Sequence, residues 1–342
     1  MFIEEIVNSY ISNTVETYPK MHTSEELYKI YQDTFSTDHF NFEPKGLYEP
    51  VKHIMSIPGK RIRPMLCLMS CEMFGGNIKD ALYASFAMEV FHNFTLVHDD
   101  IMDKADIRRG HPTVHKVFGT NAGILAGDAM LSYAYKYLCM TPASTLVDVL
   151  DVFNKTSIEI YEGQQLDVDF ETRLDVSEEE YIKMIEYKTS VLLACSLKVG
   201  AIIGGASKED QERIYNFGLY LGLSFQIKDD LLDTFGEQAK VGKRIGGDIL
   251  NNKKTFLLIN ALKKASAEDK EHLLHLMDEP NEDKKIAEVK EIFNLYHIES
   301  YTQERIEKYY QDSITYLDAI SADESSKSVV RQLAEKIHGR DY

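Results

Sequence analysis

Two segments of this sequence carry three aspartates in the same spacing, DDxxD, at the end of an apolar helical run. The first is LVHDDIMD, with Asp99, Asp100 and Asp103, and the second is FQIKDDLLD, with Asp229, Asp230 and Asp233. The first and last aspartates of each motif are four residues apart and therefore lie on one face of a helix. Like charges at this spacing repel each other, and the C-terminal end of a helix disfavours anions.

A divalent cation would compensate for this crowding of carboxylates. Mg²⁺ prefers carboxylate oxygens and commonly keeps water and phosphate oxygens as its other ligands, and the loop pattern of a calcium-binding EF-hand is missing. For one such motif in an acidic chain, a solvated acidic helix face is the simpler interpretation. Two matched copies, each after an apolar run, favour a pair of helices that bind magnesium shared with a polyphosphate.

Clustered cations complement the two acidic motifs. Arg108 and Arg109 follow the first motif, and guanidinium groups match phosphate oxygens in a bidentate manner. The segment PGKRIRP supplies Lys60, Arg61 and Arg63 at a turn, where backbone and side chains can meet an anion. Three more lysines stand in uncharged or glycine-rich surroundings: Lys188, Lys243 and Lys253. Each alone would be a surface cation, but the set predicts two pyrophosphate sites, one on metal ions and one on cations alone.

Other metal-binding or catalytic patterns are weaker in this sequence. His111 and His115 are four residues apart, but Pro112 lies between them and no third zinc ligand or HExxH glutamate accompanies them. GKRIGG lacks the GxxxxGK[ST] spacing of a P-loop. The cysteines fit no disulfide framework, and the helical spacing of Cys67 and Cys71 in an apolar run favours buried thiols.

The composition excludes several classes of partner. The chain has 342 residues, and 55 acidic against 38 basic side chains give a formal charge of -17. Without a basic excess, binding to nucleic acid or to an anionic membrane is disfavoured. No uninterrupted apolar run of about 18 residues occurs, so we expect no membrane span. MFIEEIVNSY lacks the basic and apolar regions of a signal peptide, and we expect a cytoplasmic protein.

The pattern of apolar residues is helical. The segments 79–103, 177–205 and 212–236 show apolar residues at helical spacing, and convincing strand patterns are absent. Ser177 followed by Glu180 predicts a capping box, and Gly204–Gly205 and Gly236 predict helix ends. We expect breaks around 41–50, 236–254 and 268–285, none of which divides the chain. The predicted fold class is all-α, one large helical bundle, with residues 1–342 as a single domain.

An ordered series of segments resembles the trans-isoprenyl diphosphate synthase family, the polyprenyl synthetases. The matching segments are GKRIRP, FHNFTLVHDDIMDKADIRRG, GDAML, GQQLD, YKTS, FQIKDDLLD and GKRIGGDILNNKKT. They extend over residues 59–256, and the series is far more specific than either DDxxD motif alone. The resemblance implies the isoprenoid synthase fold, in which both aspartate motifs face a central cavity, and a homodimer.

The resemblance also implies a role for each matching residue. Three Mg²⁺ ions, for which Mn²⁺ can substitute, would be bound by Asp99, Asp103 and Asp229, supported by Asp100, Asp230, Asp233 and Asp167. The allylic diphosphate would contact Arg108, Lys188 and Lys253, with Lys243 beside it. Isopentenyl diphosphate would bind without metal to Lys60, Arg63, His92 and Arg109. The forming carbocation would be stabilised by Lys188, Thr189 and Gln226. The KRIGGDILNNKK loop has one residue more than in some members, which leaves the place of Lys253 open.

The implied reaction is a head-to-tail condensation of isopentenyl diphosphate with an allylic diphosphate (dimethylallyl, geranyl or farnesyl). Metal ions and guanidinium groups neutralise the leaving pyrophosphate, the isopentenyl double bond attacks the carbocation, and a proton is then lost. Apolar helix walls would exclude water from the carbocation. A terpene cyclase and a non-catalytic regulatory subunit are the alternatives.

The residues before the first motif suggest a short product. In the family, a bulky aromatic residue five positions before the first aspartate stops chain growth early, and here that residue is Phe94. Thr95 is small, and Phe91 lies one turn earlier on the same helix. We expect a product of fifteen or twenty carbons, with a longer-chain polyprenyl diphosphate synthase as the alternative.

Overall fold

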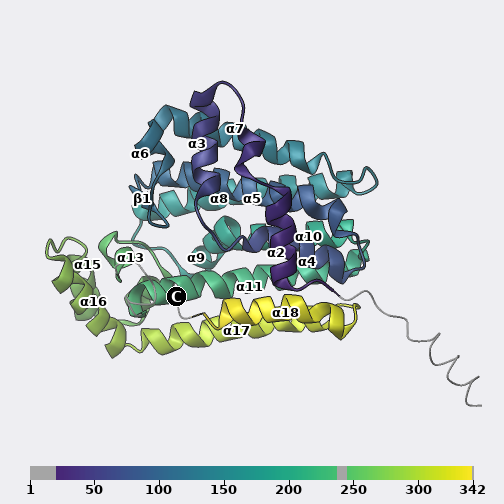
Figure 1. Cartoon of the computed structure of the whole chain (residues 1–342). Coiled ribbons are helices and arrows are strands. Elements are labelled where there is room, and N and C mark those ends of the chain that lie inside the picture. The colour runs from purple at the N-terminus through teal and green to yellow at the C-terminus, as the bar shows by residue number, and fades with distance from the viewer. Residues whose placement is uncertain (1–20, 237–244, 341–342) are drawn as a thin grey trace, which may run out of the picture.

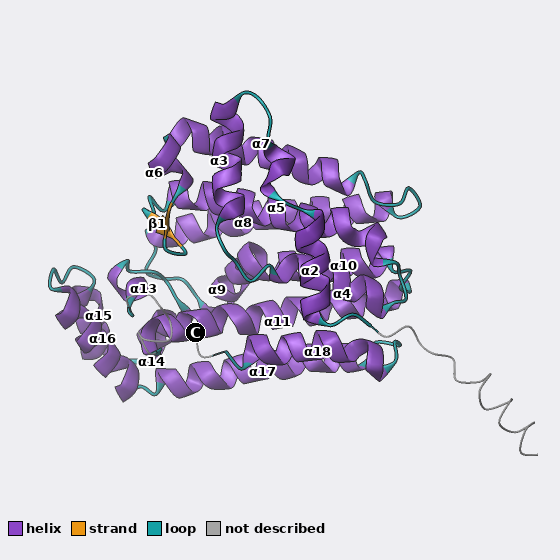
Figure 2. Ribbon diagram, viewed as in Figure 1, coloured by secondary structure: helices purple, strands orange, loops and turns teal. Residues whose placement is uncertain are grey.

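The computed structural model describes residues 21–236 and 245–340. The regular structure of these residues is helical apart from one short hairpin (Figure 2). The prediction of an all-α fold is therefore confirmed. None of the described helices combines the length and the apolar character needed to cross a lipid bilayer.

The described elements follow one another with short connections (Figure 1). Up to the middle of the chain they are α2 (Ser24–Thr34), the 3₁₀ helix η1 (Thr37–Phe40), α3 (Lys45–Ser56), α4 (Ile62–Met73), α5 (Ile78–Met102), β1 (Ile107–Arg108), β2 (His111–Pro112), α6 (Val114–Phe118), α7 (Thr120–Leu138) and α8 (Leu146–Glu171). They continue with α9 (Glu178–Ile185), the π-helical turn η2 (Glu186–Ser190), α10 (Val191–Ile203), α11 (Lys208–Phe235), α13 (Gly247–Leu250), α14 (Phe256–Lys264), α15 (Ala267–Leu276), α16 (Glu282–Leu295), α17 (Ile298–Asp318) and α18 (Glu324–His338).

All three predicted helical segments are helices. The first is α5, and Asp103 is its C-cap residue. The second contains α9, η2 and α10 in direct succession and begins with the predicted capping box of Ser177 and Glu180. The third is α11, which begins earlier than predicted, at Lys208, because the Ser207 side chain caps it. It ends before Gly236, as predicted.

The predicted breaks are confirmed only in part. The break expected at 41–50 is confined to 41–44, because α3 begins at Lys45 and continues through Pro50. After Pro50, α3 buries Val51 and Ile54. This tertiary packing outweighs the backbone hydrogen bond that a proline inside a helix removes. The break expected at 268–285 is reduced to 277–281, between α15 and α16. Within 236–254, α13 is helical.

Buried apolar side chains form two clusters that meet along α11 and α17. One cluster extends through α2 to α8, α10 and α18, and the other through α9 and α14 to α16. Helix α10 is buried on nearly every side, as expected for the centre of a bundle. Figure 1 shows α17 and α18 lying along α11, with α15 and α16 at the end of the molecule near α13.

Candidate active site

The first aspartate motif lies at the C-terminal end of α5 and is neutralised by other elements. The buried Asp100 carboxylate accepts hydrogen bonds from Arg108 Nε at 2.8 and 2.9 Å. Asp99 lies 3.4 Å from the Arg108 guanidinium and 3.1 Å from Lys188 Nζ. Asp103 is accessible at the helix end, and partial loss of hydration and the neighbouring Asp99 raise its pKa. Asp100 is therefore turned into the protein, whereas Asp99 and Asp103 remain on the accessible side.

Lys188 and Thr189 lie in the π-helical turn η2, which the sequence did not predict. Such turns are frequent at functional sites. The turn packs directly on Gly163 of α8, where an added Cβ would lie 2.4 Å from the Lys188 backbone nitrogen. One turn further along α8, Asp167 forms an ion pair with Lys188. Although burial opposes it, Asp99 and Asp167 raise the pKa of Lys188, so this lysine is a cation held between two carboxylates.

Asp230 of the second motif has a different kind of partner. It is buried and accepts hydrogen bonds from the Tyr181 hydroxyl at 2.5 Å and from the Phe256 backbone nitrogen at 3.0 Å. Burial, followed by the nearby Asp248, raises the pKa of Asp230. This carboxyl group is therefore held by neutral donors.

The other members of the second motif face different neighbours. Asp229 is exposed and forms an ion pair with Arg340, beyond the end of α18. Asp233 accepts a hydrogen bond from the Asp248 backbone nitrogen at 2.8 Å, which attaches α13 to α11. One turn before Asp229, Gln226 Oε1 accepts a hydrogen bond from Thr189 Oγ1 at 3.1 Å.

Lys253 connects the two motifs electrostatically. Loss of hydration would lower the pKa of Lys253, but Asp248, Asp103 and Asp167 raise it. Asp103 and Asp167 belong to the surroundings of the first motif, and Asp248 contacts Asp233 of the second. Lys253 therefore lies within the field of both motifs. We call Asp99, Asp103, Asp167, Asp229 and Asp233, with Arg108, Lys188 and Lys253, the aspartate cluster.

A second group of residues, Lys60, Arg63, His92 and Arg109, is called the cationic cluster. Burial and then Arg340 lower the pKa of Lys60, whereas Asp229 raises it, so Lys60 lies near the first aspartate of the second motif. Lys243, which was predicted near the allylic diphosphate, lies outside the described residues.

The cationic cluster contains an unsatisfied donor. Arg63 Nε is buried and finds no hydrogen-bond partner among the described residues. Burial, opposed by Glu89 and reinforced by Arg109, lowers the pKa of Arg63 to about 10. Burial, then Arg63 and Arg109, lower the pKa of His92, which keeps the imidazole neutral at pH 7. An anion placed here would relieve the repulsion among these cations.

Arg61 does not belong to this cluster, although the sequence groups it with Lys60 and Arg63. Its guanidinium donates to the buried Glu89 at 2.6 Å and to the Met55 carbonyl at 2.9 Å. Arg61 has a φ of 47°, and this left-handed conformation turns the chain into α4. The inward-facing Arg61 thus anchors the segment that carries the cationic cluster.

The β1–β2 hairpin separates two adjacent arginines. Its two-residue turn, Arg109–Gly110, has φ values of 51° and 79°, as in type I′ turns. Arg108 forms an ion pair with Asp100 of α5, the helix that carries the first aspartate motif. Arg109 lies against Gly59, where an added Cβ would be 2.4 Å from its guanidinium, and donates to the Pro58 carbonyl at 3.4 Å. One short hairpin thus places Arg108 in the aspartate cluster and Arg109 in the cationic cluster.

The residues predicted to limit product length lie in an aromatic group. Phe94 and Phe91 are buried and 5.4 Å apart between ring centroids. Tyr161 of α8 lies edge-on to Phe94 at 6.2 Å, and His98 lies 4.9 Å from Phe94. Thr95 is partly buried. The prediction named only residues of α5, and Tyr161 adds a second helix to this group.

The carboxylates fit magnesium that arrives with a diphosphate. In the described ranges no three acidic, histidine or cysteine side chains converge closely enough to hold a metal ion unaided. Magnesium sites shared with a diphosphate, however, need only one or two carboxylates per ion, because phosphate and water oxygens complete the coordination. Asp99 Oδ1 is buried and accepts no well-aligned hydrogen bond from the described residues, although Lys188 Nζ is 3.1 Å away. This oxygen can therefore accept a ligand.

Besides Tyr161, four residues of the site were missed from the sequence. Tyr181 and Arg340 are far from the motifs in sequence, and no pattern marks them. Asp248 follows Gly246–Gly247 in a segment that the resemblance includes, but its contact with Asp233 depends on the fold. Glu89 lies in an apolar run, and a buried carboxylate there could have suggested a cationic partner.

The comparisons with known proteins agree with this geometry. The polyprenyl synthetase family model matches residues 44–296. A short chain isoprenyl diphosphate synthase of Methanothermobacter thermautotrophicus is 42% identical over 75% of this chain and 79% of the relative. A geranylgeranyl pyrophosphate synthase of Geoglobus acetivorans is 38% identical over 88% of this chain and 92% of its own. A crystal structure of a geranylgeranyl pyrophosphate synthase, 42% identical, covers 94% of this chain and 100% of its own with a TM-score of 0.89. The chain belongs to the polyprenyl synthetase family.

Proposed function

We propose that this chain is a Mg²⁺-dependent trans-prenyltransferase that joins isopentenyl diphosphate to an allylic diphosphate and releases pyrophosphate. The observation that carries this proposal is the division of the cations by the hairpin. Arg108 lies among carboxylates that can bind metal, and Arg109 lies beside Arg63 and His92. A reaction between two diphosphates, only one of which leaves, requires two sites of this unequal kind.

The aspartate cluster would hold the diphosphate that leaves. When bound, Mg²⁺ would neutralise the charge that develops on the departing pyrophosphate. Three ions would be held by Asp99, Asp103 and Asp229, and Mn²⁺ could substitute. Arg108, Lys188 and Lys253 would bind the remaining phosphate oxygens. The side-chain oxygens of Thr189 and Gln226, fixed by their mutual hydrogen bond, would stabilise the allylic cation through their dipoles.

The cationic cluster would hold the diphosphate that stays. Without metal ions to assist its departure, isopentenyl diphosphate remains bound to Lys60, Arg63 and Arg109 while its double bond attacks the neighbouring cation. The neutral His92 would accept or donate a hydrogen bond without adding charge. Holding both reactants in place supplies much of the acceleration. The proton would leave to the departing pyrophosphate, which requires no separate base from the protein.

The product would have fifteen or twenty carbons. The geranylgeranyl synthases among the similar proteins support this length, and so does the buried aromatic group of Phe91, Phe94 and Tyr161 on the helices next to the first motif.

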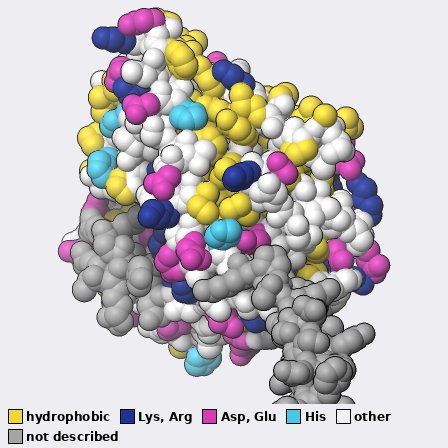
Figure 3. Space-filling model, turned by 45° about the vertical axis from the view of Figure 1, so that its right-hand side comes forward, with side chains coloured by type: hydrophobic (Ala, Val, Ile, Leu, Met, Phe, Trp, Pro, Cys, Tyr) yellow, Lys and Arg dark blue, Asp and Glu magenta, His cyan; other side chains and the backbone are white. Residues whose placement is uncertain are grey.

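The proposed enzyme is a cytoplasmic homodimer in which residues 1–342 form one domain. Several large apolar side chains of α7 and α8 are exposed, among them Ile124, Leu125 and Ile158. Exposed apolar surface of this kind is typical of subunit interfaces. On the face shown in Figure 3, hydrophobic side chains are frequent in the upper part of the view, with charged side chains among them. Analytical ultracentrifugation measures the expected dimer directly.

An assay of product length tests the proposal. Purified protein receives Mg²⁺, isopentenyl diphosphate and dimethylallyl, geranyl or farnesyl diphosphate, and the products are sized by chromatography. We expect products of fifteen or twenty carbons. Dominant products beyond about twenty-five carbons would instead show a longer-chain synthase. Hydrocarbon formed from an allylic diphosphate alone would show a cyclase, and no turnover with any pair would favour a regulatory subunit.

A further inference from the structure

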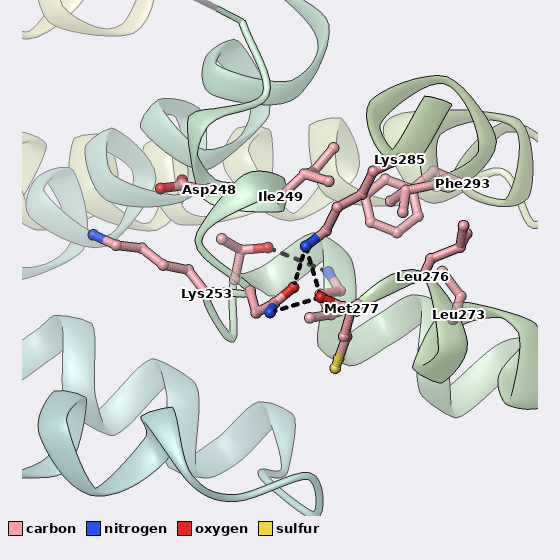
Figure 4. Close-up of a pocket in the computed structure, with 12 residues that line it drawn as sticks. Asp248, Ile249, Lys253, Leu273, Leu276, Met277, Lys285 and Phe293 are labelled. Carbon is pink, nitrogen blue, oxygen red and sulfur yellow. Dashed lines mark hydrogen bonds between the residues drawn. The ribbon is translucent and has the colours of Figure 1, made fainter. Parts of the chain in front are cut away.

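Lys285 of α16 is a buried lysine whose ammonium is bound by uncharged oxygen atoms. Its Nζ lies 2.8 Å from Asn252 Oδ1, 2.9 Å from the Met277 carbonyl and 3.4 Å from the Leu250 carbonyl. Only 5% of the residue is exposed. A buried ammonium is unfavourable unless its donors are satisfied, and here three donors meet three acceptors. Lys285, Asn252 and Met277 line a small cavity of about 20 Å³ between α13, α15 and α16 (Figure 4).

Two of these acceptors lie at the C-terminal end of α13, where Leu250 is its last residue and Asn252 belongs to the turn that follows. Asn252 has a φ of 54°, a left-handed conformation that asparagine tolerates better than most residues. Its side-chain amide also donates to the Met277 carbonyl, at 3.1 Å. Lys285 and Asn252 together therefore attach this turn to the connection between α15 and α16.

The next residue along the chain is Lys253 of the aspartate cluster. Its backbone nitrogen donates to the Asp248 carbonyl at 3.0 Å, which closes the turn. In Figure 4, the Lys253 side chain extends away from the Lys285 ammonium, on the side of Asp248. The same turn thus has Lys285 on one side and carries Lys253 toward the carboxylates on the other.

We propose that Lys285 is a positioning residue that fixes the turn at Leu250–Asn252 and thereby directs Lys253 to the allylic diphosphate. This inference rests on the proposed function, in which Lys253 contacts that diphosphate. Lys285 itself touches neither substrate. It holds the turn in place from inside the protein. Only the binding of the allylic substrate should depend on it.

Lys285→Met removes the ammonium and keeps most of the side-chain volume. We expect the KM for the allylic diphosphate to rise about tenfold, as for the loss of one well-directed charged contact. The KM for isopentenyl diphosphate and kcat should change less than about twofold. Calorimetry with a non-ionisable allylic thiolodiphosphate and Mg²⁺ should show the same loss of affinity without turnover. Lys284→Met is the matched control, because Lys284 is an exposed neighbour on α16 that pairs with Glu279.

A second variant covers the case in which Lys285→Met does not fold. Asn252→Gly keeps the left-handed backbone accessible and removes the side chain that joins Lys285 to the turn. It should produce the same selective loss of allylic affinity. Equal changes in the KM values of both substrates would overturn the proposal, because a general structural defect has no preference between them.

Lys253→Met separates this proposal from the assignment on which it rests. If Lys285 acts through Lys253, Lys285→Met should have no further effect in the Lys253→Met background. Additive effects would overturn the role of Lys285 and leave the role of Lys253 intact. Unchanged allylic affinity in Lys253→Met alone would overturn the assignment of Lys253, and the present inference with it.

Discussion

The two DDxxD motifs have the same spacing but different surroundings. In the first, the middle aspartate, Asp100, is paired with the charged Arg108, and in the second, Asp230 is held by the Tyr181 hydroxyl and a backbone nitrogen. Both middle aspartates are buried, and both outer pairs lie toward the site. Helical spacing therefore decides which carboxylates turn inward, while distant elements decide whether an inward carboxylate is neutralised by a charge or by neutral donors.

Removing an outer aspartate should have the largest effect in either motif. Asp99→Ala and Asp229→Ala should each reduce Mg²⁺-dependent turnover on the order of 10³-fold, because the departing pyrophosphate loses electrostatic stabilisation. Steady-state rates measure the loss, and circular dichroism should show unchanged helicity. Near-normal turnover in one variant would show that the motifs are not equivalent in function.

The middle aspartates should differ in their effect on stability. Asp100→Asn leaves Arg108 without its buried counter-ion and should lower the free energy of unfolding by about 3–5 kcal/mol. Asp230→Asn still offers an oxygen to its two neutral donors and should lower it by less than about 1.5 kcal/mol. Urea unfolding of the metal-free proteins compares the two. Equal losses would mean that the different partners of Asp100 and Asp230 do not control the free energy of unfolding.

The residue five positions before each motif should also differ in effect. Phe94 packs in the aromatic group beside the first motif, and Phe94→Ala should lengthen the main product by at least one five-carbon unit. The corresponding residue before the second motif is Ser224, which is buried and donates to the Ile306 carbonyl of α17. Ser224→Ala should leave product length unchanged. Chromatography of both product mixtures tests whether only the first motif has a length-limiting residue before it.

The last expected effect is a pH dependence of stability due to Asp230. Because burial raises the pKa of Asp230, the folded state retains a proton that the unfolded chain loses above about pH 4. Its contribution to stability is therefore complete below that pH and is lost as the pH rises toward the folded-state pKa. In metal-free protein, Asp230→Asn should gain stability relative to wild type with rising pH, by at most about 1.4 kcal/mol per pH unit. A constant difference between pH 5 and 8 would contradict the raised pKa.

Much of the site was predictable because its chemistry follows from local spacing. Four-residue spacing places Asp99 with Asp103, and Asp229 with Asp233, whatever surrounds the helix. Apolar periodicity gave the helices that carry them, and adjacent arginines indicated sites for anions. By contrast, the two-residue hairpin and the π-helical turn produce no strong local pattern. Both depend on close packing, such as that of Lys188 on Gly163.

The sequence alone determined the helical class, the paired acidic motifs and the cations near them, since these depend on residue type and spacing along one helix. Only the tertiary structure decided which residues contact these aspartates and cations. It sends Arg108 and Arg109 to different clusters, places Arg340 at Asp229 and Tyr181 at Asp230, and brings Lys285 under the turn that carries Lys253. The reason is physical: charge neutralisation and burial depend on distance in space, and residues on different helices become neighbours only when those helices pack.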